Sequence, residues 1–170
     1  NALSGFSSIL TDANIDIGTR QQCNEIIQQN SDLLLKLIDD VVDLSSLEIG
    51  KMQFQFGNSD AVAICRNVVD TVEKIKQTSA TVLFQTSQEK MEIYTDEARL
   101  QQLLINLLIN ATKFTTEGSI TLLLEKESEE MTVFSVTDTG CGIAPEKQGQ
   151  IFNRFEKLNE YAQGTGLGLS

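Results

Sequence analysis

The sequence predicts an α/β two-layer sandwich preceded by an α-helical hairpin. Three observations lead to this fold class. Apolar residues repeat by three and four between about residues 19 and 47, as in a helix that packs along a seam. After Gly50 the pattern changes to short alternating stretches, which are typical of half-buried strands. Helical stretches at about 60–77 and 96–114 then alternate with strands, as in a layer of helices over a mixed sheet.

The first predicted domain covers residues 1–50. NALSGFSSILTD (1–12) is typical of the end of a helix, and the adjoining DANIDIGT favours a turn before the second helix. Two helices joined in this way have little core of their own, so we expect a homodimer with a four-helix bundle. A hairpin folded onto its own chain is the alternative. The expected seam consists of Leu34, Leu37, Val41 and Leu44.

The second predicted domain covers residues 51–170. MQFQF (52–56) alternates apolar and polar side chains and is predicted to be its first strand. The charged run around Ser128 is expected to be a solvated turn between two paired strands. The further strands are predicted at 81–86, 91–94, 119–127 and 130–138.

Composition and charge exclude several classes of function. The net charge of −11 leaves no basic stripe for the phosphates of a nucleic acid. No apolar run approaches the roughly 18 residues of a membrane span, so any membrane anchor is expected outside this chain. The three cysteines form no CxxC pair, which indicates free thiols in a reducing cytoplasm. Histidine is absent from the 170 residues.

The helix expected at 96–114 is apolar over most of its circumference, which indicates a buried helix. One narrow polar stripe remains, and it faces either solvent or a wet pocket. In a pocket, amide oxygens can bind a hard cation, and a lysine can contact a phosphate. The stripe consists of Arg99, Gln102, Asn106, Asn110 and Lys113.

Two glycine-rich stretches point to the same chemistry. DTGCGI (138–143) follows a predicted strand, and GTGLGLS (164–170) leads into an apparent helix start. Glycines allow close approach of a ligand to the backbone, and a helix N-terminus offers free N–H groups to phosphates. Either stretch alone is also typical of an ordinary turn. Asp138, at the end of a buried strand, would need a partner such as the amino group of adenine.

Four motifs occur in a fixed order within residues 96–170: NLLINATKF, DTGCGI, IFNRF and GTGLGL. Together they resemble the asparagine, first glycine, phenylalanine and second glycine boxes of the ATP-binding family of sensor histidine kinases, DNA gyrase, mismatch-repair ATPases and heat-shock chaperones. Two longer stretches narrow the likeness to bacterial sensor histidine kinases: DEARLQQLLINLLINATKFT and DLSSLEIGK. The second of these is similar to the end of a dimerisation hairpin. The resemblance implies that family's fold, with ATP and Mg²⁺ bound.

The resemblance also implies roles for single residues. Asn110 would bind Mg²⁺ with help from Asn106, and Lys113 would contact phosphate. Phe114 would pack near the base, and Asp138 would bind the adenine amino group. The remaining ATP-binding positions implied by the motifs are Gly140, Gly142, Ile143, Lys157, Gly164, Thr165, Gly166, Leu167 and Gly168.

Hydrolysing relatives carry a glutamate one helical turn before the metal-binding asparagine, and this sequence has Asn106 there. An amide cannot accept a proton at neutral pH, which favours transfer to another nucleophile over hydrolysis. The lid anchored by Phe152 and Phe155 is also very short before Gly164, which disfavours a chaperone or topoisomerase domain.

By the resemblance, the γ-phosphate passes to a histidine and then to an aspartate of a response regulator receiver domain. The family carries a segment like HEIRTPL directly before the equivalent of Asn1, so we expect the phosphoacceptor upstream and further residues beyond Ser170. The chain would then be the cytoplasmic part of a membrane-anchored sensor. A catalytically silent, nucleotide-binding dimerisation module is the alternative.

Overall fold

The computed structural model describes residues 16–128, 131–149 and 151. The chain divides into two compact units, Asn1–Met52 and Gln53–Ser170. The assignment of dimerisation to residues 1–50 and of nucleotide binding to residues 51–170 stays a prediction.

The first unit contains one long helix, α2, at Ile17–Glu48. It begins after Asp16, whose carboxylate accepts a hydrogen bond from the Thr19 amide at 3.0 Å, as an N-cap residue does. It ends before Gly50, which adopts a left-handed backbone with φ +64°. The predicted helix at about 19–47 is therefore present. The other arm of the predicted hairpin, residues 1–12, lies outside the described residues.

Helix α2 exposes much of its apolar surface in the single chain. Leu34 and Val41 of the predicted seam are 50% and 45% exposed. The other apolar residues of α2 that are at least half exposed are Ile17, Leu35, Ile38, Val42 and Leu47. None of the described helices has an apolar stretch that could cross a membrane.

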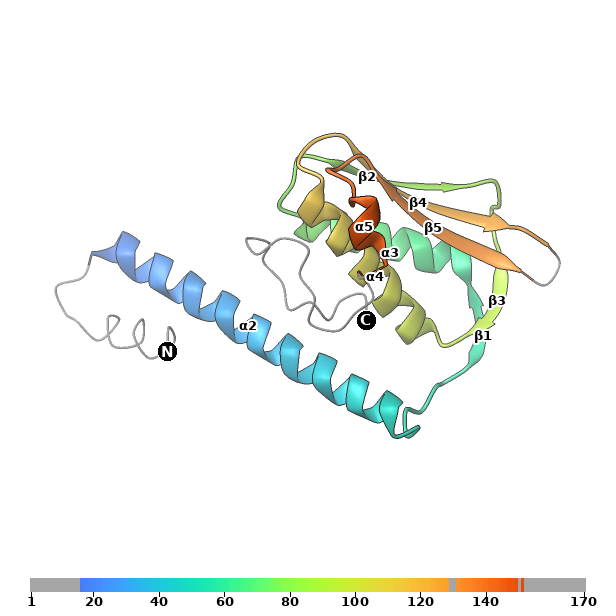
Figure 1. Ribbon diagram of the computed structural model, residues 1–170, viewed down its shortest axis with the longest axis horizontal. Helices are drawn as coiled ribbons and strands as arrows, with labels where there is room; N and C mark the ends of the chain where they lie inside the picture. The colour runs from blue at the N-terminus through green and yellow to red at the C-terminus, as the bar shows by residue number, and fades with distance from the viewer. Residues whose placement is uncertain (1–15, 129–130, 150, 152–170) are drawn as a thin grey trace. The chain divides into compact units, whose positions relative to one another are not determined.

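The second unit alternates strands and helices, as Figure 1 shows. Its strand and helix bounds are β1 Gly57–Asp60, α3 Ala61–Ile75, β2 Thr81–Thr86, β3 Glu92–Thr95, α4 Glu97–Phe114, β4 Ser119–Lys126, β5 Thr132–Asp138 and α5 Pro145–Gln148.

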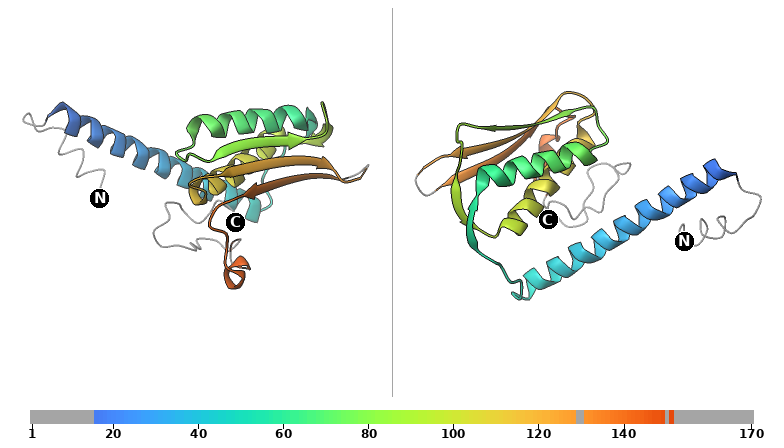
Figure 2. Two further views of the ribbon diagram at one scale, coloured as in Figure 1. Left: turned by 90° about the horizontal axis from the view of Figure 1, so that it is seen from above. Right: turned by 180° about the vertical axis from the view of Figure 1, so that it is seen from behind.

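The main sheet has three strands in the order β2-β4-β5, with β2 parallel and β5 antiparallel to β4. Strands β1 and β3 form a separate antiparallel pair. Helices α3 and α4 lie against one face of the main sheet and against each other (Figures 1 and 2). The two-layer α/β sandwich is therefore confirmed, and the sheet is mixed as predicted.

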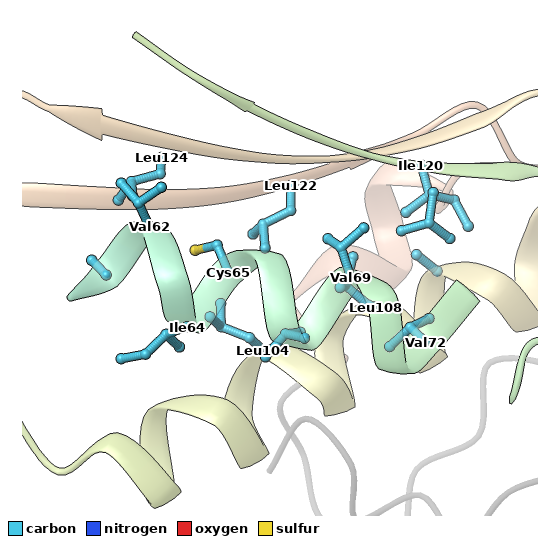
Figure 3. Packing of buried hydrophobic residues seen from close by; sticks show 14 of the residues in the cluster. Val62, Ile64, Cys65, Val69, Val72, Leu104, Leu108, Ile120, Leu122 and Leu124 are labelled. Atoms are coloured by element: carbon cyan, nitrogen blue, oxygen red, sulfur yellow. The ribbon is translucent and has the colours of Figure 1, made fainter. Parts of the chain in front are cut away.

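The core lies between the sheet and the two helices (Figure 3). Strand β4 alternates buried and partly buried residues, so that one set of side chains points at the helices. The buried residues at the centre are Val62, Cys65 and Val69 of α3, Leu104, Leu108 and Ala111 of α4, and Ile120, Leu122 and Leu124 of β4.

The prediction of a strand at MQFQF is wrong, because the first strand, β1, begins only at Gly57. The Gln55 amide donates to the Asp96 carboxylate at 2.7 Å instead of to a neighbouring strand. The alternating aromatic residues contact one another: the ring centroids of Phe54 and Phe56 are 5.8 Å apart, and Phe56 stacks on Tyr94 at 5.9 Å. Ring contacts therefore explain the alternation that resembles a strand.

The prediction that α4 is buried over most of its circumference is also wrong. Only Leu104, Leu108 and Ala111 of this helix are buried. Leu103 is 54% exposed and Phe114 is 42% exposed. Leu100, Ile105 and Ile109 are partly buried against the core, so within the described residues α4 packs mainly through the side that bears Leu104, Leu108 and Ala111.

Candidate functional site

Helix α4 positions the asparagine motif. Asp96 caps its N-terminus and accepts a hydrogen bond from the Arg99 amide at 3.1 Å. Asn106 and Asn110 lie one turn apart and are partly buried, and Lys113 near the last turn is exposed. The three predicted ligand-binding residues therefore share the face of α4 that points away from the core.

The C-terminal end of α4 contacts the first glycine motif directly. The Cys141 amide donates to the carbonyl oxygen of Phe114 at 3.3 Å. The Thr115 hydroxyl lies 3.4 Å from Oδ1 of Asp138, which also accepts a hydrogen bond from the Gly140 amide at 2.9 Å. Residues 114–115 and 138–141 are thus brought together although they are more than 20 residues apart in the chain.

The two glycines of this motif are required for different reasons. A Cβ at Gly140 would lie 2.3 Å from the Phe114 carbonyl oxygen and 2.8 Å from Asp138 Oδ1, so there is no room for one. Gly142 has open space around it but adopts φ +67°, a conformation that other residues rarely take. Together they allow a tight turn whose backbone is open to a ligand.

Asp138 differs from the expectation of a carboxylate at the end of a buried strand. Strand β5 is only partly buried, and Asp138 at its end is exposed. Its Oδ1 nevertheless has partners, the Gly140 amide and the Thr115 hydroxyl. The carboxylate is therefore held in place by the turn and by Thr115 at the end of α4, and not by burial.

A second set of contacts braces the same end of the unit. Thr139 Oγ1 accepts from the Ser119 amide at 3.1 Å, and it lies 2.2 Å from where a Cβ of Gly118 would be. The Thr78 hydroxyl donates to the carbonyl oxygens of Thr115 and Thr116. The Thr78 contacts join the loop before β2 to the end of α4, and the Thr139 contact joins the residue after β5 to the start of β4.

Thr115 ends the stretch NLLINATKFT, but no role was predicted for it from the sequence. Thr115 is fully buried, and among the described residues it and Asp96 are the buried polar side chains. A polar residue directly after an apolar helix, followed by a glycine turn, is the signal that could have identified it.

The described residues contain only part of the predicted site. Asn106, Asn110, Lys113 and Phe114 lie on α4, whose last residue, Phe114, contacts the turn of residues 138–143 through its carbonyl oxygen. Ile143, in this turn, is 40% exposed. The structural positions of several predicted ATP-binding residues lie outside the described residues: Lys157, Gly164, Thr165, Gly166, Leu167 and Gly168. The same holds for Phe152 and Phe155 of the predicted lid.

The donor groups of the described site fit a magnesium nucleotide. The described residues contain no cluster of three or more His, Cys, Asp or Glu that could hold a metal ion. The predicted ligands Asn106 and Asn110 are amides, which bind a hard cation such as Mg²⁺ together with water and substrate phosphates. The open space around Gly142, in the same turn as the oriented Asp138, fits the close approach of a purine base.

Comparisons with known proteins identify the family. Residues 95–170 match the family of histidine kinase-, DNA gyrase B- and HSP90-like ATPases. The autoinducer 2 sensor kinase/phosphatase LuxQ of Vibrio harveyi is 33% identical over the whole chain, and the match covers 21% of LuxQ. This chain thus spans about a fifth of the length of the curated relatives it matches.

Two solved structures are similar to this chain. The catalytic domain of the histidine kinase ThkA is 31% identical with a TM-score of 0.60, and the match covers 68% of this chain and 76% of that domain. Full-length ShkA, in complex with AMPPNP, is 27% identical with a TM-score of 0.76 over 99% of this chain and 35% of ShkA. The chain therefore belongs to the histidine kinase-, DNA gyrase B- and HSP90-like ATPases, and within them to the bacterial two-component sensor histidine kinases.

Proposed function

We propose that this chain binds Mg-ATP and is the catalytic and dimerisation core of a sensor histidine kinase. The γ-phosphate is transferred to a histidine and then to an aspartate of a response regulator. The observation that carries the proposal is the hydrogen bond between the Cys141 amide and the Phe114 carbonyl oxygen, at 3.3 Å. It joins the helix that bears the asparagines to the turn that bears Asp138.

Each group has a distinct role in this proposal. The amide oxygens of Asn110 and Asn106 bind the magnesium ion, which bridges and partly neutralises the phosphates. Lys113, exposed near the last turn of α4, supplies a positive charge to the phosphates. Asp138 accepts a hydrogen bond from the adenine amino group. Phe114, whose carbonyl oxygen contacts this turn and whose side chain is 42% exposed, packs near the base in this proposal.

Asn106 favours transfer over hydrolysis. It lies one helical turn before Asn110, where a carboxylate would be needed to take a proton from water. Phosphoryl transfer relies mainly on positioning and charge stabilisation, so ATP is held until a histidine nitrogen reaches it. The new bond joins that nitrogen to the γ-phosphorus, and the bond to the β–γ bridging oxygen breaks, which releases ADP. The 170 residues contain no histidine, so the acceptor belongs to another part of the protein or to another chain.

Two protein partners are proposed, a second copy of this chain and a response regulator. Several apolar side chains of α2 are exposed in the single chain, and those of Leu34, Ile38 and Val41 are 45% to 52% exposed. Burial of this surface in a homodimeric bundle would stabilise the helix. A response regulator receiver domain is the proposed acceptor of the phosphoryl group. The proposed location is the cytoplasmic side of a membrane, with any anchor outside these residues.

Calorimetric titration of the chain with ATP tests the binding site. With Mg²⁺, the wild type is expected to bind ATP, and EDTA is expected to weaken this binding. Asn110→Ala should bind Mg-ATP at least tenfold more weakly, because an amide ligand of the metal is lost. Asn67→Ala, at an exposed position of α3, is the matched control and should bind as the wild type does. Equal affinity of Asn110→Ala and wild type would refute the metal role of Asn110.

Labelling of the full-length protein with γ-labelled ATP tests the reaction. A histidine kinase forms a phosphoprotein that is labile in acid and stable in alkali. Steady release of phosphate without such a phosphoprotein would instead identify an ATPase. Binding of ATP with neither product would identify a silent nucleotide-binding module.

A further inference from the structure

Thr115 has an unusual position for a hydroxyl group. It is fully buried at the end of α4, with its amide bonded to the Ala111 carbonyl oxygen at 3.0 Å. Its carbonyl oxygen accepts from the Thr78 hydroxyl, so the backbone on both sides of Thr115 is fixed. A buried hydroxyl destabilises the fold unless it has a hydrogen-bond partner. The partner is Oδ1 of Asp138, 3.4 Å from Thr115 Oγ1.

Gly140 completes a tight cluster with these two residues. Its amide donates to the same Asp138 oxygen at 2.9 Å. A Cβ at Gly140 would lie 2.8 Å from both Thr115 Oγ1 and Asp138 Oδ1, so both oxygens occupy the space that a larger residue would fill. Two donors on one oxygen, the Gly140 amide at 2.9 Å and the longer contact from the Thr115 hydroxyl at 3.4 Å, restrict the rotation of the carboxylate.

This arrangement determines which carboxylate oxygen is available to a ligand. Both hydrogen bonds found for the Asp138 side chain within the described residues go to Oδ1. Asp138 is exposed at the end of β5, so Oδ2 is the oxygen that can accept from a bound molecule. An ionised carboxylate accepts hydrogen bonds and donates none.

We infer that Thr115 is a positioning residue that sets the nucleobase specificity of the site through Asp138. The inference rests on the proposed function, in which Asp138 binds the adenine amino group. With Oδ1 held by Thr115 and Gly140, Oδ2 is fixed in direction and selects a base that presents an amino group there. Hypoxanthine has a carbonyl oxygen in place of the amino group. That oxygen and Oδ2 are both hydrogen-bond acceptors, so they cannot form a hydrogen bond and the base is rejected.

Titrations with three nucleotides in the presence of Mg²⁺ test this inference: ATP, inosine triphosphate and purine riboside triphosphate, which has hydrogen in place of the amino group. The wild type should prefer ATP over both others. Thr115→Val keeps the size of the side chain and removes the hydroxyl. This variant should bind ATP roughly tenfold more weakly than the wild type, which is the effect of about one hydrogen bond. It should bind purine riboside triphosphate with the same affinity as the wild type does.

Two observations distinguish a positioning role of Thr115 from a structural one: the behaviour of a serine variant, and the ratio of the affinity for ATP to the affinity for purine riboside triphosphate. Thr115→Ser keeps the hydroxyl and should restore the preference for ATP. A structural role of Thr115 would weaken the binding of all three nucleotides alike and leave the ratio unchanged, which would overturn the inference. Thr115→Ala provides the same ratio if the valine variant does not fold.

The proposed function fails in a different way from this inference. If the wild type binds no ATP, or binds ATP and purine riboside triphosphate equally, the role of Asp138 itself is refuted. If the wild type prefers ATP and Thr115→Val keeps that preference in full, only the role of Thr115 is refuted.

Discussion

The amide of Cys141 donates a hydrogen bond to the carbonyl oxygen of Phe114 at 3.3 Å. Phe114 is the last residue of α4, and Cys141 belongs to the turn after β5. A last-turn helix carbonyl has no partner within its own helix, so this bond satisfies a group that would otherwise need water. The same bond fixes the turn against the helix, and the site depends on that contact.

Substitution of Gly140 by alanine is expected to break this contact. The new Cβ would lie 2.3 Å from the Phe114 carbonyl oxygen, so the turn must move away from α4. Such overpacking costs about 1–3 kcal/mol in the free energy of unfolding. We also expect loss of ATP binding, because Asp138 would move with the turn. Urea denaturation and calorimetric titration measure the two effects.

The matched control for this change is Gly149→Ala. Gly149 has an ordinary helical backbone with φ −69° and open space around the place of a Cβ. Its free energy of unfolding should change by less than about 0.5 kcal/mol. A Gly140→Ala protein as stable and as active in binding as Gly149→Ala would contradict the close packing at the turn.

Two leucines of α4 are expected to differ sharply when truncated. Leu108 is fully buried between α3 and the sheet, whereas Leu103 is 54% exposed on the other side of the helix. Leu108→Ala should lower the free energy of unfolding by about 2–5 kcal/mol through lost burial and a residual cavity. Leu103→Ala should cost less than about 1 kcal/mol. Similar losses from both variants in urea denaturation would mean that α4 is buried on both sides.

This pair shows what the sequence of α4 can and cannot predict. The spacing of leucines and asparagines was enough to predict a helix at 96–114 and a polar stripe along it, and the structure has both. It could not tell which apolar side is covered, because that depends on where α3 and the sheet pack. The segment LLIN occurs twice in α4, at 103–106 and 107–110; its second leucine is buried in both copies, whereas the adjacent Leu103 is exposed.

Site residues that stand within one sequence motif could be predicted from the sequence. Contacts between residues that are distant in the sequence could not. Asn110 and Asp138 stand in recognisable motifs, so their positions could be predicted. The contact of Thr115 with Asp138 joins residues 23 apart and depends on the antiparallel pairing of β4 with β5. Gly140 and Gly142 look alike in the sequence, but only the structure distinguishes a glycine needed for space from one needed for its backbone angle.

Acid is expected to weaken the second unit partly through Asp96. Its carboxylate accepts from the Gln55 amide at 2.7 Å and from the Arg99 amide at 3.1 Å. These bonds, first that from Gln55, lower the pKa of Asp96 below its ordinary value of 3.8. A lowered pKa in the folded state means that the stabilisation is complete above about pH 4 and is lost as the pH falls through the folded-state pKa.

The pH dependence of urea denaturation between pH 7 and pH 2 measures this effect. Asp96→Asn should be less stable than the wild type at pH 7 and should lose less stability below pH 4. Asp70→Asn, which removes an exposed carboxylate of α3, corrects for the change in net charge. A wild type and an Asp96→Asn variant with parallel pH profiles would show that Asp96 contributes nothing to the acid sensitivity.

Thiol labelling is expected to distinguish Cys141 from Cys65. Cys141 is exposed in the glycine turn, whereas Cys65 is fully buried in the core. Burial raises the pKa of the Cys65 thiol to about 11, so almost no thiolate forms there at neutral pH. Thiolate is the reactive form, and access is also required. In a Cys23→Ser background at pH 7.5, we expect one fast reaction at Cys141 and a slow one at Cys65 that follows unfolding.

The same experiment reports on the nucleotide. Because Cys141 adjoins Gly140, Mg-ATP bound at the turn should slow the labelling of Cys141. It should not accelerate the labelling of Cys65. Cys141→Ser should abolish the fast reaction, and urea should bring Cys65 to the rate of an exposed thiol. A fast reaction that survives Cys141→Ser would show that the core around Cys65 opens in the native protein, which the complete burial of Cys65, Val62 and Leu108 does not allow.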